Sequence, residues 1–312
     1  MVSIPYKELS PIYIAAFNYS NLFSFCLALA VVAYVYYSAT INAEEKLQIE
    51  HKKTSAALIE RNHAFMLLNQ ELAEAAQYVK TILPPPITEG IIRTDWRFVP
   101  STSLGGDAFG YHWVDDYHFA IYLIDVSDHG VGAALLSVSV MDVLPSQSLP
   151  DTDFKAPEQV LRALNIAFPG EENNDMFFTI WYGVYKIDTR KLIYASGGHP
   201  PALLLDRNSS GVSMVTPLRT PNYVIGGMAE ITYEKRECVV GKNNMLYIFS
   251  DGGYEVEKMD GSMWRFQEFA DFMNRNKNDG QSILDRLYSH ARNLGKSGKF
   301  EDDFTIIEVA FG

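Results

Sequence analysis

The chain has 312 residues, of which 47% are hydrophobic and 21% charged, so it is long enough for one large globular domain with accessory segments or for two modest domains. Its formal net charge is −12, and an acidic chain without clustered Lys and Arg is a poor candidate for nucleic-acid binding. The two cysteines, Cys26 and Cys238, lack metal-ligand spacing, and we expect two reduced thiols in a protein that faces the cytoplasm.

The first predicted element is a membrane-spanning helix over residues 22–39, inside an N-terminal segment of residues 1–41. No charged residue occurs between Glu8 and Glu44, and eighteen helical residues rise about 27 Å, close to the thickness of the hydrocarbon core. Several Lys and Arg residues follow the segment whereas only Lys7 precedes it, which predicts that the C-terminal side is cytoplasmic. A cleaved signal peptide, a buried core helix and the end of a larger sensor are the alternatives.

Residues 42–85 predict a long helix that links this segment to the rest of the chain. No Gly or Pro occurs from Asn42 to Leu83, and three consecutive prolines then end the helix. We expect a parallel coiled coil that makes the chain a homodimer and carries a signal from the membrane; a helix packed on its own domain is the alternative. Arg61 interrupts the seam of apolar residues, which are Leu58, Phe65, Leu72 and Val79, with Leu68, Ala75 and Ile82 offset by three.

Residues 86–312 change to a pattern of strands and helices. Runs rich in Ile, Val, Tyr and Phe predict strands, which follow one another in pairs instead of alternating with helices. This order favours an α+β fold, with antiparallel sheets covered by helices, over a doubly wound parallel sheet. The expected strands are 95–99, 119–126, 177–185, 192–196, 202–205, 245–249 and 305–311, and the expected helices are 131–144, 157–168, 267–274 and 282–294.

Four aspartates stand at or just after the ends of apolar runs. Carboxylates without an Arg or Lys beside them repel one another, so their convergence would require a cation. Ligands that are all oxygen select a hard cation, Mg²⁺ or Mn²⁺. The four are Asp107 after Gly105-Gly106, Asp125 at the start of Asp-Val-Ser-Asp-His-Gly, Asp251 before Gly252-Gly253, and Asp302 beside Asp303.

Two histidines lie in glycine-containing turns of the same region. His129 follows the Asp125 motif, and His199 stands between Gly198 and Pro200. Each could be a metal ligand or a general acid, and each could instead fix its turn by hydrogen bonds. The sequence leaves both interpretations open.

Taken together, in this order and spacing, these motifs resemble the bacterial serine/threonine phosphatases of the SpoIIE/RsbU type, within the PP2C-like metal-dependent phosphatases. The resemblance also rests on Leu83-Pro84-Pro85-Pro86 and on residues 176–185, and it covers about residues 76–311. It implies a four-layer α-β-β-α sandwich with two antiparallel sheets for residues 86–312. It further implies two Mn²⁺ or Mg²⁺ ions, with these ligands: Asp107, Asp125, the Val126 carbonyl, Asp251 and Asp302, with Asp303 as the alternative to Asp302.

Three positions depart from the family pattern. Asp128 stands where Gly is usual, Ser250 where Thr is common, and Gly253 where a β-branched residue is common. None of these departures removes a carboxylate, so they bear on substrate fit and level of activity rather than on the chemistry.

We therefore expect a metal-dependent phosphatase in which metal-bound water attacks phosphoserine or phosphothreonine directly. The resemblance implies a phosphorylated STAS-type anti-anti-sigma factor as the substrate, in a partner-switching pathway. Together with the apolar segment 22–39, it predicts a single-pass protein of the bacterial inner membrane with a cytoplasmic catalytic domain, or alternatively a cytoplasmic protein. A catalytically weak binding module that signals through its dimeric linker is one alternative, and a two-metal nuclease or cyclase is another.

Overall fold

The computed structural model of the protein describes residues 11–101, 104–207, 213–275, 282–295, 298 and 300–312. The chain divides into two compact units, Met1–Leu68 and Asn69–Gly312. The second unit contains every strand and all the helices that follow the first one.

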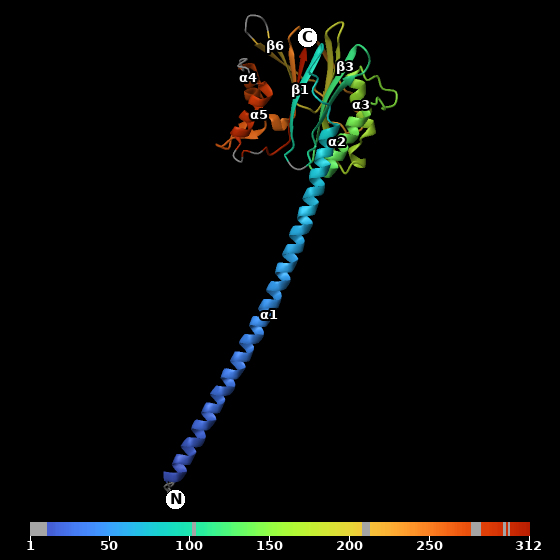
Figure 1. Ribbon diagram of the computed structural model, residues 1–312. Coiled ribbons are helices and arrows are strands. Elements are labelled where there is room, and N and C mark those ends of the chain that lie inside the picture. Colours follow the sequence, from blue (N-terminus) through green and yellow to red (C-terminus); the bar gives the residue numbers. More distant parts are fainter. Residues whose placement is uncertain (1–10, 102–103, 208–212, 276–281, 296–297, 299) are drawn as a thin grey trace, which may run out of the picture. The chain divides into compact units, whose positions relative to one another are not determined.

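A single helix, α1 (Pro11–Ile82), is the first element of the chain and is the long blue and cyan helix of Figure 1. The predicted membrane segment and the predicted linker are one continuous helix, because no Gly or Pro interrupts them. By length and composition α1 could cross a membrane: it holds an 18-residue window with mean hydropathy 1.9, and none of that window is buried.

The burial of the predicted apolar seam differs between the two parts of α1. In the Asn69–Gly312 unit, Leu72, Ala76 and Val79 are half-buried and Leu83 is buried. Their spacing of three to four residues places them on one helix face, which packs on the unit to which they belong. Before residue 69, the apolar seam residues Leu58, Phe65 and Leu68 are exposed. The stretch before residue 69 therefore keeps an exposed apolar surface of the kind that a coiled coil would need.

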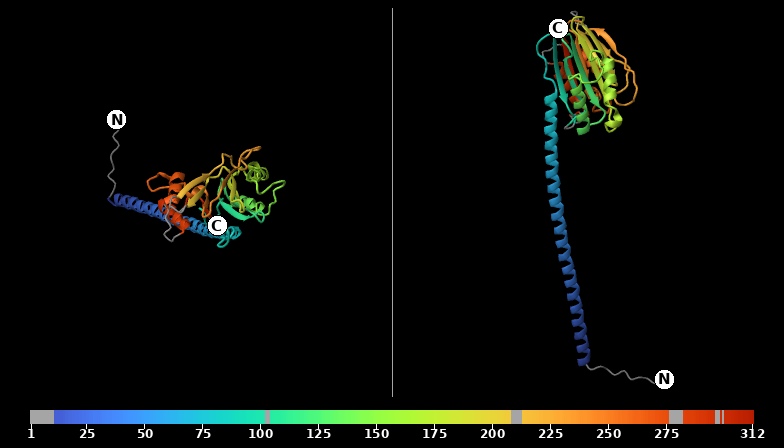
Figure 2. Two further views of the ribbon diagram at one scale, coloured as in Figure 1. Left: turned by 90° about the horizontal axis from the view of Figure 1, so that it is seen from above. Right: turned by 90° about the vertical axis from the view of Figure 1, so that its right-hand side faces the viewer.

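Two five-stranded antiparallel sheets form the centre of the second unit (Figures 1 and 2). Sheet A has the order β1-β12-β9-β6-β7: Ile92–Val99, Phe304–Phe311, Met245–Phe249, Ala202–Arg207 and Ser213–Leu218. Sheet B has the order β2-β3-β4-β5-β8: Ala108–Trp113, His118–Val126, Phe178–Lys186, Lys191–Gly197 and Arg236–Val239. A small hairpin pairs β10 (Val256–Glu257) with β11 (Met263–Trp264).

Helices cover the outer face of each sheet, as Figure 1 shows. Helices α2 (Val131–Val143) and α3 (Pro157–Ala167) contact sheet B, and α4 (Phe266–Arg275) and α5 (Ile283–Leu294) contact sheet A. Two short 3-10 helices, η1 (Gly170–Glu172) and η2 (Asp251–Gly253), lie in connecting loops. The four-layer α-β-β-α sandwich predicted from the sequence is confirmed.

The side chains of sheet A alternate between two separate cores. Along β9, Leu246 and Ile248 belong to the large core that includes the space between the sheets, whereas Tyr247 and Phe249 belong to the core under α4 and α5. Successive strand residues point to opposite faces, so a sheet buried on both faces requires unbroken apolar runs. This requirement explains why the run 245–249 was readable as a strand.

The strands that the sequence analysis missed lie at sheet edges or in the short hairpin. β2, β7 and β8 are all edge strands, and edge strands need a less regular apolar pattern. Gly110 interrupts the sequence pattern of β2, and it is a glycine because a Cβ there would collide with the Tyr122 ring. Pro217 lies in β7, and β8 carries charged residues. β1 also begins at Ile92, three residues before its predicted start.

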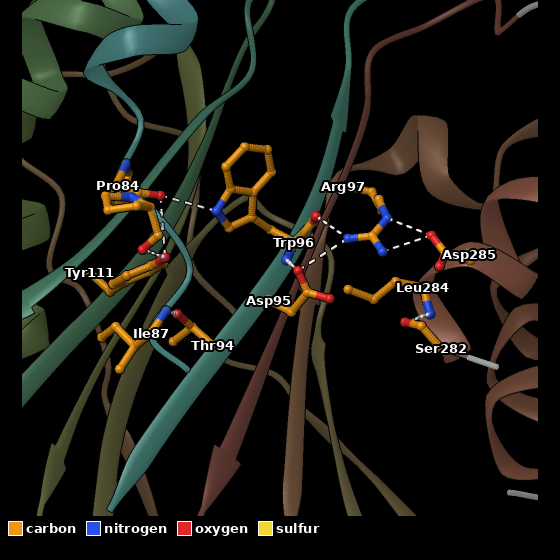
Figure 3. Close-up of polar contacts among 11 residues, drawn as sticks. Pro84, Ile87, Thr94, Asp95, Trp96, Arg97, Tyr111, Ser282, Leu284 and Asp285 are labelled. Atoms are coloured by element: carbon orange, nitrogen blue, oxygen red, sulfur yellow. Dashed lines mark hydrogen bonds and ion pairs between the residues drawn. The ribbon is translucent and has the colours of Figure 1, made fainter. Parts of the chain in front are cut away.

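The proline segment after α1 is fixed to both sheets (Figure 3). The Pro84 carbonyl accepts a hydrogen bond of 3.0 Å from the indole N–H of Trp96, on β1. The Tyr111 hydroxyl, on β2, donates to the Pro85 carbonyl at 2.7 Å and to the Pro84 carbonyl at 3.3 Å. Thr94 adds a two-way contact with the Ile87 backbone. The chain therefore enters the sandwich between one edge strand of each sheet.

Candidate metal centre

Sheet B brings two of the predicted acids to one end. Asp107 directly precedes β2, and Asp125 is the penultimate residue of β3. The strands pair with Ala108 opposite Ile124, so the antiparallel register places Asp107 at the level of Asp125. Gly105 and Gly106 form the loop that leads to Asp107.

Sheet A brings the other acids to its corresponding end. Asp251 begins η2 and is separated from β9 by Ser250 alone, and Asp302 and Asp303 directly precede β12. The two strands pair with Ile306 opposite Phe249, and the pairing continues where the Ser250 N–H donates to the Thr305 carbonyl at 3.1 Å. Acids that are far apart in the sequence therefore meet at neighbouring strand ends.

The acids of the two sheets are close enough to change one another's protonation. Burial, and then the charges of Asp125 and Asp303, raise the pKa of Asp107 well above its ordinary value. Burial, and then the charges of Asp251, Asp302 and Asp303, raise the pKa of Asp125 to about 8. Burial, and then the charge of Asp302, raise the pKa of Asp251 to about 6. The five carboxylates predicted from the sequence form one cluster.

The cluster fits divalent cations by its donor atoms. Both side-chain oxygens of Asp107 are buried without a hydrogen-bond partner; the hydroxyls of Thr305 and Ser250 lie near enough to act against the rise in its pKa but form no well-oriented bond. Such a carboxylate is costly unless a cation or donors offset its charge. As they stand, no three His, Cys, Asp or Glu side chains among the described residues are gathered tightly enough to hold one ion. The oxygen-only set matches the preference of Mg²⁺ and Mn²⁺.

Asp302 and Asp303 lie in different surroundings. The Asp303 carboxylate is buried and accepts three hydrogen bonds: from the Ser101 N–H at 2.7 Å, the Ser101 hydroxyl at 3.0 Å and the Asp107 N–H at 3.3 Å. Asp302 is exposed, and its carboxylate accepts the Asp303 N–H at 2.7 Å. Asp303 thus fixes the loop that carries Asp107, whereas the Asp302 carboxylate accepts fewer hydrogen bonds and has more lone pairs free to bind a cation.

The two loop glycines are required by close approach rather than by turn geometry. A Cβ on Gly105 would collide with the Asp303 carboxylate. A Cβ on Gly106 would lie 2.9 Å from the carbonyl oxygens of Val126 and Asp128. The backbone of the Asp107 loop therefore passes directly against the Val126 carbonyl, the predicted backbone ligand.

The two histidines differ in burial. His129 is exposed, and its backbone N–H donates to the Asp128 carboxylate at 2.8 Å. His199 is buried, and its Nδ1 lies 2.9 Å from the Pro200 carbonyl, which accepts only; Nδ1 therefore carries the proton. Burial lowers the pKa of His199 to about 4. Its Nε2 is buried and has no hydrogen-bond partner.

Ser250, one of the departures from the family pattern, serves the same cluster. Its hydroxyl donates to the Asp303 carbonyl at 3.0 Å and accepts the Thr305 N–H at 3.2 Å. A Thr hydroxyl could make the same two bonds, so this departure leaves the strand ends joined.

A cleft of about 410 Å³ opens beside the cluster. Asp125, Asp251 and Glu255 contribute acids to its wall, and Thr179, His199 and Arg219 also line it. The sequence analysis did not single out Thr179, Arg219 or Glu255. Thr179 could be recognised as a site residue only in the structure, because the pairing of β3 with β4 places it opposite Asp125.

Comparisons with known proteins agree with this geometry. The family model described as "Stage II sporulation protein E (SpoIIE)" matches residues 115–312. The phosphoserine phosphatase RsbU of Bacillus subtilis is 28% identical over 242 residues, which are 77% of this chain and 70% of RsbU. The phosphoserine phosphatase RsbP of the same species is 27% identical over 184 residues, which are 59% of this chain but only 45% of RsbP.

Solved structures show the same fold. The SiaA-PP2C domain of Pseudomonas aeruginosa superposes with a TM-score of 0.68 at 18% sequence identity, and the match covers 80% of this chain and 99% of that domain. Because the family match extends over more than half of the chain, the protein belongs to the SpoIIE family, and it shares the fold of the SiaA-PP2C domain.

Proposed function

We propose that the protein is a metal-dependent phosphatase that hydrolyses phosphoserine or phosphothreonine on another protein. The observation that carries the proposal is the convergence of carboxylates from both sheets, with the buried oxygens of Asp107 left without donors. The phosphoserine phosphatases among the relatives support the same substrate chemistry.

Asp107, Asp125, Asp251, Asp302 and the Val126 carbonyl would hold two Mn²⁺ or Mg²⁺ ions. When bound, these ions supply an activated water and offset the charge of the phosphoryl group. The chain contributes the rest of the site: Asp303 fixes the Asp107 loop through its hydrogen bonds, and the cleft beside Asp125 and Asp251 admits the phosphorylated side chain. Its volume lies within the usual range for a ligand site.

We further propose that the substrate is a phosphorylated STAS-domain protein, as the resemblance implies, in a partner-switching pathway. The length and apolar composition of α1 support an anchor in the bacterial inner membrane, with the phosphatase domain in the cytoplasm. The exposed seam residues Leu58, Phe65 and Leu68 support a homodimer through the linker helix.

The test is phosphate release from a phosphorylated STAS-domain protein by the full chain in detergent, with Mn²⁺ and with EDTA. Asp125→Asn, from sheet B, is compared with Asp116→Asn, a control at an exposed acid outside the cluster. We expect Mn²⁺-dependent release that Asp125→Asn abolishes and Asp116→Asn preserves. Tight binding of the phosphoprotein without phosphate release would instead support a binding module, and release that persists in EDTA would contradict the proposal.

A further inference from the structure

The cleft contains polar groups that the acid cluster does not use. The Thr179 hydroxyl is buried and has no hydrogen-bond partner, although Thr179 lies opposite Asp125 on the neighbouring strand. Among the described residues that line the cleft, Arg219 is the single basic side chain. Thr179 and Arg219 thus line the same cleft as Asp125 and Asp251.

The backbone around Arg219 is held on both sides. The preceding carbonyl, of buried Leu218, accepts the indole N–H of Trp181 at 3.3 Å. On the other side, the buried Thr220 hydroxyl accepts the Ser196 N–H at 2.7 Å and lies 2.9 Å from the Ser196 hydroxyl. The Arg219 side chain itself is exposed and makes no ion pair with the described residues. A guanidinium is therefore presented from a fixed backbone at the rim of an acid-lined cleft.

The position of the Arg219 guanidinium would favour binding of an anionic ligand. A phosphoryl dianion that enters the cleft approaches Asp125, Asp251 and Glu255, whose negative charges oppose it. A guanidinium offers donors in a planar fork that matches two phosphoryl oxygens, and such charge-assisted bonds are stronger than neutral ones. Neither Lys nor Gln reproduces both the charge and the fork.

We propose that Arg219, with the Thr179 hydroxyl as a second donor, forms the subsite that binds the phosphoryl oxygens of the substrate. The inference rests on the proposed function, because it names how the same cleft recognises its phosphomonoester. Arg219 sets affinity for the phosphoryl group and not for the surrounding protein. It therefore acts equally on a phosphoprotein, on p-nitrophenyl phosphate and on inorganic phosphate.

The experiment uses the full chain in detergent and the variants Arg219→Gln, Arg219→Lys and Thr179→Val. The control is Arg236→Gln, at an exposed arginine of β8 that does not line the cleft. Three quantities are measured in Mn²⁺: KM for the phosphoprotein, KM for p-nitrophenyl phosphate and the inhibition constant of inorganic phosphate. Calorimetric binding of inorganic phosphate in Mg²⁺ gives a fourth quantity that needs no turnover.

We expect Arg219→Gln to raise all three kinetic constants about tenfold, the usual effect of losing one charge-assisted hydrogen bond. Arg219→Lys should recover part of the loss, Thr179→Val should raise the constants about threefold, and Arg236→Gln should change none. Unchanged constants in Arg219→Gln overturn the proposal, as does a KM that rises for the phosphoprotein alone. If the wild type binds phosphate through Arg219 but hydrolyses nothing, the proposed function fails and the subsite stands; a wild type that binds no phosphate removes the subsite.

Discussion

The two sheets bring carboxylates to the same place under opposite local conditions. From sheet B, Asp107 and Asp125 arrive buried, and Asp107 has no donor of its own. From sheet A, Asp303 accepts three hydrogen bonds, and the Gly252 N–H lowers the pKa of Asp251 against the effect of burial. The sheet A acids are partly compensated by hydrogen bonds from the protein, whereas both carboxylate oxygens of Asp107 in sheet B have no hydrogen-bond partner.

This difference divides the cluster into acids that the protein's own N–H groups already bind and acids that we propose as metal ligands. A carboxylate with its oxygens already bound to N–H groups stabilises a loop. A carboxylate without donors costs free energy in the folded protein and recovers it on binding a cation. The comparison can be tested by changing acids of the two sheets separately.

The largest effect should come from the ligating acids of either sheet. Asp125→Asn and Asp251→Asn each remove a charge that would hold a cation, and each should lower kcat by roughly 10³-fold or more. The double variant should be little worse than either single one, because residues that act as a unit are not additive. Steady-state kinetics on p-nitrophenyl phosphate in Mn²⁺ measure this; two independent, multiplying losses would argue against a shared centre.

The next effect is a dependence of stability on pH that metal removes. The pKa of Asp125 is about 8 in the folded protein, above its ordinary 3.8, so between these values the folded chain holds a proton that the unfolded chain releases. In EDTA the free energy of unfolding should therefore fall, by on the order of a few kcal/mol, as the pH rises from about 4 to 8. Denaturant unfolding at several pH values should show this slope. Mg²⁺ should flatten it, and Asp125→Asn should reduce it without removing it, because the pKa values of Asp107 and Asp251 are also raised. A stability that is independent of pH in EDTA would show that the sheet B acids are not strained.

Substitutions of Asp302 and Asp303 should affect different properties, metal affinity for Asp302 and stability for Asp303. Asp303→Asn weakens the bonds to Ser101 and Asp107 and should cost about 2 kcal/mol of unfolding free energy. Asp302→Asn should leave stability in EDTA unchanged and should reduce Mn²⁺ affinity. Chemical denaturation and Mn²⁺ titration of both variants measure the two effects. A loss of Mn²⁺ affinity in Asp303→Asn together with a loss of stability in Asp302→Asn would make Asp303 the ligand.

The smallest expected effect is a loss of stability when the hydrogen bonds between the two sheets and the proline segment after α1 are removed. Tyr111→Phe removes the hydroxyl that donates to the Pro84 and Pro85 carbonyls, at a cost of about 1 kcal/mol. Trp96→Phe removes the matching donor from sheet A and should cost at least as much. Thermal unfolding, with the exposed Tyr117→Phe as control, would measure both. An unchanged midpoint in both variants would show that the proline segment is held by packing alone.

The sequence predicted the central strands and the acids for the same reason. Strands such as 245–249 are buried on both faces and leave unbroken apolar runs, and an aspartate directly after such a run is conspicuous. Edge strands β2, β7 and β8 gave no such pattern. Two other residues of the cleft, Thr179 and Arg219, could not be predicted from the sequence. They reach the cleft through strand pairing and through the anchoring of Thr220, both of which join segments distant in sequence.

The crowding around the Asp107 loop has a consequence for mutational screens of this protein. At Gly105 and Gly106 even a methyl group would strike the Asp303 carboxylate or the Val126 carbonyl, so alanine there displaces the acids without altering any of them. A survey scored by activity alone would therefore mark two residues without side chains as essential. Only a parallel measurement of folding would distinguish residues that do chemistry from those that simply leave room for it.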